Sequence, residues 1–157
     1  MNQKVHEFLV EWAMNFIKNK DVFAKKILSI GKSNNGFDID IKYKDKEQFA
    51  LVLEDFGDFD SISGKLNQDK SLSIFTLNSK ENLDFLTKNW KKFLGYRHLT
   101  IIFTNPFSNL DKKWIISPYV HSRICDEGSL SLGLKSMFEM VEEIDENKCI
   151  SRIGSNK

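Results

Sequence analysis

The chain has few cysteines. Their number argues against a disulfide-rich secreted protein, and their spacing argues against a C-x-x-C site. Cys125 and Cys149 are the only cysteines among 157 residues. Two thiols are too few for the disulfide framework of a small secreted protein, and the sequence has no C-x-x-C spacing of the kind found in zinc and thiol redox sites. We therefore expect both cysteines to be reduced.

Long apolar runs and an excess of charge of one sign are also missing. Nothing approaches the stretch of about 18 apolar residues that a membrane span needs, and His6, Glu7 and Glu11 interrupt the segment where a secretory signal would be apolar. The 23 basic and 22 acidic residues leave a net charge of +1, so no global field attracts nucleic acid or an anionic membrane. We expect a cytoplasmic protein that does not bind membranes.

The familiar signatures of phosphate binding and of serine hydrolases are absent. The sequence contains no GxxxxGK(S/T), no GxGxxG and no GxSxG. Their absence argues against nucleotide hydrolysis and against serine-nucleophile chemistry. We predict no catalytic residues and no cofactor.

The chain does have enough apolar material for one hydrophobic core. Hydrophobic residues make up 41% of it, with 13 Phe and 3 Trp, which suits a single domain of ordinary size. This aromatic content also favours self-association, because apolar side chains left outside a core usually mark an interface. We predict one domain over residues 1–146 and a polar, frayed tail over residues 147–157.

Hydrophobic periodicity predicts a mixture of helices and strands. Apolar residues recur at helical spacing from Val5 to Ile17, and strict alternation over residues 37–43 predicts a strand with one solvated face. A short helical piece is expected at 22–28 and an exposed loop at 57–70. Further strands are expected at 49–53, 71–77, 98–104 and 113–117, and further helices at 79–94, 118–125 and 134–144.

These elements define an α+β fold. We predict a single antiparallel sheet of about five strands, in the order α-β-β-β-α-β-β-α, with its helices packed mainly on one face. Asn78 is expected to cap the middle helix, with Glu81 three residues later completing a capping-box-like pair. The order of elements resembles that of small bacterial secretion-chaperone-type domains, and the resemblance is one of architecture.

The segment 114–140, WIISPYVHSRICDEGSLSLGLKSMFEM, places several reactive or charged residues between two apolar runs. In a helix over 118–125, His121 and Cys125 would lie one turn apart, which suits a shared metal ion or a Cys–His nucleophile pair, although a zinc site would need two more ligands. The alternative is packing under the sheet, or contact with an anionic ligand or a partner's carboxylate through Arg123 and His121. The candidate binding residues are Tyr119, His121, Arg123 and Glu127.

Acidic residues gather in the predicted hairpin, where Asp38 and Asp40 share a strand face and Glu54 follows the next strand. Such carboxylates can bind a divalent cation. A helix followed by these strands resembles the restriction-endonuclease-like nucleases, whose pattern is an acid on one strand and Glu-x-Lys on the next. Here Asp55 and Phe56 follow Glu54, so only Lys42 could supply the lysine.

The resemblance implies a metal-dependent nuclease, or a degenerate and inactive relative of one, with Asp38, Asp40 and Glu54 as metal ligands. It requires Asp38 or Asp40 to lie within about 5 Å of Glu54, with a lysine at the same point.

A third candidate mixes basic and aromatic residues over 88–98. Lys88, Lys91, Lys92 and Arg97 could contact nucleic-acid phosphates while aromatic rings stack on bases. However, Trp90 and Phe93 fall on the buried stripe of the helix, and cations near the end of a helix are also explained by the helix dipole. Nucleic acid is therefore not the partner that we expect.

The sequence as a whole favours binding over catalysis. We predict an adaptor, a chaperone-like module or a regulatory subunit, whose partner is another protein or a second copy of the chain. The nuclease is the alternative. Three or more ionisable side chains around one sheltered pocket would contradict the expectation that the polar residues do not converge.

Overall fold

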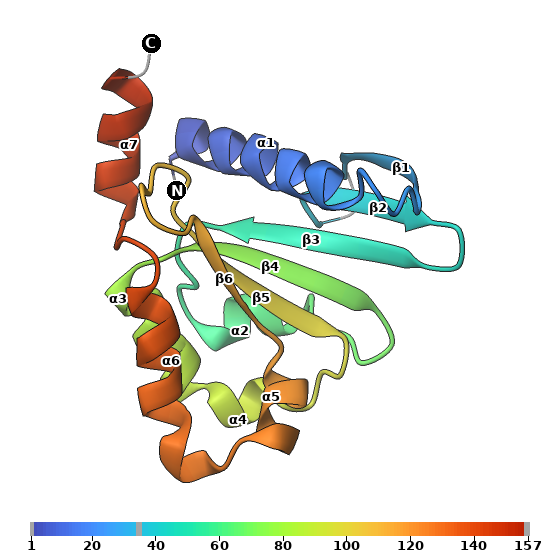
Figure 1. Cartoon of the computed structure of the whole chain (residues 1–157). Coiled ribbons are helices and arrows are strands. Elements are labelled where there is room, and N and C mark those ends of the chain that lie inside the picture. The colour runs from blue at the N-terminus through green and yellow to red at the C-terminus, as the bar shows by residue number, and fades with distance from the viewer. Residues whose placement is uncertain (1, 34–35, 156–157) are drawn as a thin grey trace.

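The computed structural model describes residues 2–33 and 36–155, which form one mixed β-sheet with helices on both faces (Figure 1). Its strands are β1 (Ile27–Lys32), β2 (Ile39–Tyr43), β3 (Glu47–Leu53), β4 (Ser71–Leu77), β5 (Leu99–Thr104) and β6 (Lys113–Ile116). Its helices are α1 (Gln3–Lys20), α2 (Phe59–Ser63), α3 (Lys80–Lys88), α4 (Trp90–Phe93), α5 (Pro118–Ile124), α6 (Leu130–Glu139) and α7 (Glu146–Ser155), with a 3-10 turn at Glu127–Ser129. None of these helices is both long and apolar enough to cross a membrane.

The strands lie across the sheet in chain order, from β1 to β6. β1, β2 and β3 pair antiparallel, β4 and β5 continue parallel to β3, and β6 returns antiparallel. The predicted α+β class is confirmed, but the purely antiparallel sheet of about five strands is wrong. The connections after β3 and β4 contain helices. Such crossover connections bring the chain back to the edge of the sheet where the previous strand began, so the next strand pairs parallel to it.

The sixth strand is β1, in a region where the sequence predicted a helix at 22–28. α1 ends at Lys20, and the carboxylate of Asp21 then accepts hydrogen bonds from the backbone N–H of Lys26 at 2.9 Å and of Ile27 at 3.0 Å. These bonds turn the chain so that β1 pairs with β2. The hydrogen-bond ladder between β1 and β2 satisfies the backbone N–H and C=O groups of this segment. This gain outweighs the weak helical periodicity of its sequence.

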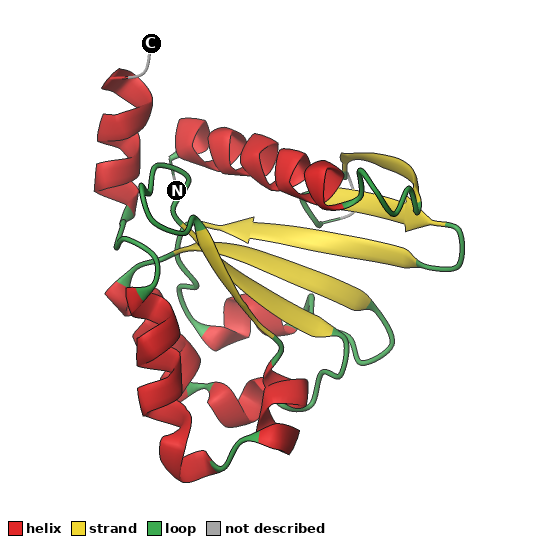
Figure 2. Ribbon diagram, in the orientation of Figure 1, coloured by secondary structure: helices red, strands yellow, loops and turns green. Residues whose placement is uncertain are grey.

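Helices cover both faces of the sheet, whereas we predicted them mainly on one face (Figure 2). The core under α1 and α7 includes Val5, Leu9, Ile39, Phe75 and Cys149. The core on the other face, under α2, α3, α4 and α6, includes Phe56, Ile74, Leu86, Phe103 and Leu134. Adjacent residues Ile74 and Phe75 of β4 thus enter different cores, which explains why this central strand is buried along almost its whole length.

The carboxyl-terminal segment is helical, although we predicted a frayed tail over 147–157. The Asp145 carboxylate accepts a hydrogen bond from the Lys148 backbone N–H at 2.9 Å, and Cys149 in the first turns of α7 is fully buried. Burial of this face stabilises a segment whose composition is otherwise polar. The predicted loop at 57–70 likewise contains α2, and of the predicted tail only residues 156–157 lie outside the described residues.

Candidate functional site

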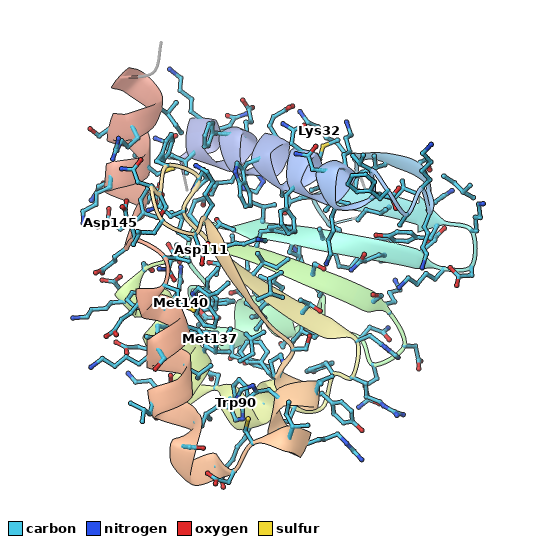
Figure 3. The ribbon with its side chains drawn as sticks, in the orientation of Figure 1. Lys32, Trp90, Asp111, Met137, Met140 and Asp145 are labelled. Carbon is cyan, nitrogen blue, oxygen red and sulfur yellow. The ribbon has the colours of Figure 1, made fainter. Side chains whose placement is uncertain are left out.

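A cleft opens at the carboxyl ends of the parallel strands β3 and β4. Glu54 follows the end of β3, and the turn from Leu77 into α3 follows β4. Neighbouring parallel strands end at the same edge of a sheet, and this edge is the usual ligand-binding edge of open α/β sheets. Residues at the start of α7, of which Asp145 is labelled in Figure 3, form another wall. The cavity has a volume of ≈ 450 Å³.

Acidic side chains dominate the lining, so we call this cavity the acidic cleft. Its acids are Glu54, Asp55, Glu81, Asp145 and Glu146. The ionisable residues therefore do gather around one cavity, contrary to the expectation that they would not converge. No lysine or arginine occurs among the described residues that line it. Because the whole chain carries a net charge of only +1, the cleft is a local concentration of negative charge rather than part of a generally acidic surface.

Glu54 is the most buried of these acids, with 3% of its surface exposed. His6 of α1 lies between it and Asp38: the imidazole Nε2 is 2.8 Å from Asp38 Oδ1, and Nδ1 is 3.4 Å from Glu54 Oε1. The backbone N–H of Val52 also donates to Asp38, to Oδ2 at 2.7 Å. His6 Nδ1 and Glu54 Oε1 are both buried without a hydrogen-bond partner. The buried Oε1 of Glu54 therefore faces the His6 imidazole, which does not line the cleft.

The same crowding shifts two pKa values. Burial raises the pKa of Glu54, because removal from water disfavours the charged carboxylate, and the nearby His6 only partly opposes this. Burial, followed by the negative charges of Glu54 and Glu146, raises the pKa of the Cys149 thiol to about 11. Both shifts have burial as their first cause, because removal from water disfavours the charged form of each group.

Asn82 of α3 holds the segments that carry the cleft. Its Nδ2 donates to the carbonyl oxygens of Glu54 at 3.0 Å and Leu77 at 2.9 Å, and its Oδ1 accepts from the backbone N–H of Phe56 at 3.1 Å. The Ser79 side chain caps α3 by accepting the backbone N–H of Asn82, so the prediction that Asn78 caps this helix is wrong. The end of β3, the end of β4 and α3 are thus joined through one buried amide.

Sequence reasoning selected neither His6 nor Asn82 for the site, although both carry a signal. His6 lies four residues before buried Val10, and Asn82 lies four residues before buried Leu86. A polar side chain on the apolar face of an amphipathic helix must find polar partners inside the fold. This pattern indicates a polar contact but not its location.

The raised pKa of Glu54 predicts a pH-dependent difference between the wild-type protein and Glu54→Gln. The folded state holds the carboxyl proton more tightly than the unfolded chain, so wild-type stability should fall as the pH rises above the ordinary value of 4.5 towards the raised value. Glutamine cannot ionise. The free energy of unfolding of Glu54→Gln should therefore rise relative to wild type over this interval, by at most about 1.4 kcal/mol per pH unit.

Urea denaturation at a series of pH values measures this difference. Glu81→Gln removes one negative charge from the exposed part of the same cleft and serves as the control. Parallel stability profiles for wild type and Glu54→Gln would show that Glu54 is not the group responsible.

The structure brings together two of the three predicted metal ligands, Asp38 and Glu54, but with the imidazole of His6 between them. Asp40 is half-buried, and its Oδ1 has no hydrogen-bond partner. Lys42 lies elsewhere, with its Nζ 4.0 Å from Glu47 Oε1. Within residues 2–33 and 36–155 no group of three metal-ligating side chains has the geometry to hold an ion.

The predicted binding residues of the 114–140 segment divide into two groups. His121 and Glu127 line a second cavity of ≈ 520 Å³ beside Trp90, which Figure 3 labels near α4 and α5. The His121 and Trp90 rings meet edge to face at 5.7 Å. Tyr119 and Arg123 instead contact each other, since Arg123 donates to the Tyr119 hydroxyl at 2.9 Å. The structure therefore does not join all four residues in one site.

The basic residues of the 88–98 segment contact other parts of the protein. Lys91 lies 3.5 Å from the Glu127 carboxylate, Lys92 lies over the Phe59 ring at 5.1 Å, and Arg97 lies over the Tyr119 ring at 5.4 Å. Trp90 is buried, as predicted. Three of the four candidate cations thus have intramolecular partners, and the aromatic ring nearest to them in sequence is not free to stack on a base.

Comparison with protein families, with curated proteins and with solved structures gives no match for this chain.

Proposed function

We propose that this protein is a binding domain whose acidic cleft receives a cationic segment of a protein partner. The observation that supports this most is the lining of the cleft, which has five carboxyl groups and no lysine or arginine among its described residues. A partner that brings positive charge gains from all of these groups, and the field of the cleft would steer it there.

The competing proposal is an anionic ligand at the amino-terminal ends of α3 and α7, which both border the cleft. The sizes of the opposing charges argue against an anionic ligand. A helix amino terminus contributes roughly half of a positive charge, whereas five acids surround the same cavity. Even with some of these acids protonated, the cleft remains negative.

Helix capping explains part of the acidity but not its inner end. Asp145 accepts the Lys148 backbone N–H, and Glu146 accepts the backbone N–H of Asn2 at 3.1 Å. These contacts stabilise helix ends without any partner. Glu54 caps no helix, and its buried Oε1 lies 3.4 Å from Nδ1 of His6. Asp55 and Glu81 are exposed acids of the cleft and are open to a cationic ligand.

Catalysis by His6 is disfavoured by its own contacts. Asp38 lies at one ring nitrogen and Glu54 at the other, so neither nitrogen faces a substrate, as a general base must. The metal-dependent nuclease remains the alternative prediction, favoured by the approach of Asp38 to Glu54. It predicts that Mg²⁺, Mn²⁺ or Zn²⁺ raises the melting temperature, because a ligand of the folded state alone stabilises it; we expect no increase.

The proposal is tested with two short Gly–Ser peptides of equal length, one rich in lysine and arginine and the other rich in glutamate. Titration calorimetry should detect binding of the basic peptide only, and the binding should weaken as salt is added. Replacing Glu81 with glutamine and Asp145 with asparagine should weaken it by roughly two- to thirtyfold, because each exposed ion pair contributes about 0.2–1 kcal/mol.

The matched control replaces Asp69 with asparagine and Glu139 with glutamine. It changes the net charge by the same amount at exposed positions outside the cleft and should leave binding unchanged. Equal binding of both peptides, or equal loss in both double variants, would contradict the proposal.

Self-association remains our second prediction for the partner. Phe23, Leu28 and Val22 are exposed apolar side chains close to the edge strand β1, with 97%, 64% and 53% of their surfaces accessible. Such a group supports an interface with a second copy. A strictly monomeric protein in sedimentation experiments would exclude it.

A further inference from the structure

We infer that the second cavity, beside Trp90, binds a neutral and largely apolar small molecule through a hydrogen-bond acceptor such as a carbonyl oxygen. This cavity shares no lining residue with the acidic cleft, so the inference does not depend on the proposed function. Three features of the lining support it: a buried indole N–H without an acceptor, apolar walls, and charged groups that already have partners within the protein.

The first feature is the indole N–H of Trp90, which lies where α4, α5 and α6 come together (Figure 3). Trp90 has only 5% of its surface exposed. A buried tryptophan normally finds a partner for its N–H, as Trp114 does by donating to Asn78 Oδ1 at 2.7 Å. No described residue accepts a hydrogen bond from Trp90 Nε1, and this nitrogen is not closed off from solvent. The donor is therefore open to a group in the cavity that the ring lines.

The second feature is the apolar part of the lining. The Trp90 ring, half-buried Leu94 and buried Leu130 form its walls, and the His121 ring meets Trp90 edge to face at 5.7 Å. Small-molecule sites are usually apolar cavities with a few placed polar groups, and ≈ 520 Å³ is within their ordinary range of volume. An apolar body on these walls would hold its acceptor against the indole.

The third feature is the pairing of the charges. Lys91 Nζ lies 3.5 Å from Glu127 Oε1, and Asp126 Oδ1 accepts both the backbone N–H and the hydroxyl of Ser129 at 2.9 Å. A charged ligand would gain only by displacing one of these partners. A protein segment would bring backbone N–H and C=O groups that need partners of their own, and this lining offers few. A neutral small molecule avoids both costs.

The first test uses acetophenone and α-methylstyrene, which have the same shape but differ in that a methylene group replaces the carbonyl oxygen. Acetophenone should shift the indole N–H signal of Trp90 in a two-dimensional proton–nitrogen spectrum and leave those of Trp12 and Trp114 in place. Trp90→Phe keeps an aromatic wall but removes the donor. It should weaken acetophenone by roughly two- to tenfold, the value of one neutral hydrogen bond, and leave α-methylstyrene nearly unchanged in ligand-detected titrations.

Cys125 provides a second measurement that needs no variant. It is exposed and lines the cavity, whereas Cys149 is fully buried, so iodoacetamide should modify Cys125 first. Half-saturating acetophenone should slow this reaction about twofold, because the thiol must be accessible to react. Mass spectrometry of the intact protein follows the rate.

A matched pair of variants assigns the binding to the cavity. Cys125→Phe places a ring within the lining and should abolish binding of both probes. Val120→Phe adds the same ring at an exposed position of α5 that does not line the cavity, and it should leave binding unchanged. Circular dichroism and urea denaturation confirm that each variant is folded before it is titrated.

Each contrary outcome removes one part of the inference. An unshifted Trp90 signal, or equal losses for the two probes in Trp90→Phe, would overturn the indole as the donor. Benzoate that binds as tightly as acetophenone would overturn the neutral class of ligand. Binding that survives Cys125→Phe, or alkylation that acetophenone does not slow, would overturn the cavity as the site. None of these outcomes bears on the acidic cleft.

Discussion

Replacing Asn78 with alanine is expected to lower the free energy of unfolding by about 3–5 kcal/mol. Asn78 is fully buried. Its Oδ1 accepts the indole N–H of Trp114 at 2.7 Å, and its Nδ2 donates to the carbonyl oxygens of Phe138 at 3.1 Å and Val141 at 3.0 Å. Alanine would leave all three groups buried without these partners, at a cost of about 1–3 kcal/mol for each group that finds no water.

Urea denaturation monitored by circular dichroism measures the effect. The control is Asn67→Ala, where the side chain is exposed and accepts only the Asp69 backbone N–H. We expect the control to change stability by less than about 1 kcal/mol. A loss from Asn78→Ala as small as that of the control would show that water replaces the amide and that Asn78 does not join β4, β6 and α6.

Replacing Asn82 with alanine should damage both stability and the acidic cleft. The change removes the donor to the Glu54 and Leu77 carbonyl oxygens and the acceptor of the Phe56 N–H, and all three hydrogen bonds are buried. We expect a loss of about 2–4 kcal/mol in the free energy of unfolding. The segment 54–56 then loses its attachment to α3, so binding of the basic peptide should weaken by about tenfold in the protein that remains folded.

Asn89→Ala is the matched control for Asn82. The Asn89 side chain is half-buried in the same region, at the end of α3, and donates only to the Phe85 carbonyl oxygen at 2.9 Å. It should lose some stability but keep its affinity for the peptide. If Asn82→Ala keeps full affinity as well, Asn82 has no role in positioning the cleft.

These two asparagines also show where sequence reasoning succeeds and where it stops. Apolar periodicity over Val5 to Ile17 predicted α1, and alternation over 37–43 predicted β2, because helix and strand periods depend on residues close in the chain. The capping prediction placed Asn78 at a helix end, one residue from the observed cap at Ser79. The actual side-chain contacts of Asn78, up to 64 residues away, have no local signature.

The acidic residues also show which contacts the sequence predicts and which it does not. The sequence selected Asp38 and Glu54 as partners, and the fold does bring them near each other. What it did not indicate is the imidazole between them, which comes from α1 and lies 32 residues before Asp38 in the chain. Nor did it indicate that Asp145 and Glu146 would join Glu54, since the segment that carries them was expected to lie at or beyond the end of the domain.

Composition and local pattern were sufficient for the α+β class, for most of the strands and for the absence of long apolar spans. Parallel pairing of β3, β4 and β5, the addition of β1 and the docking of α7 depended on contacts between distant segments. The acidic cleft belongs to this second group. Its residues lie on three separate stretches of chain, and only strand register and helix packing fix their distances, so the cost of crowding like charges appears only once the chain has folded.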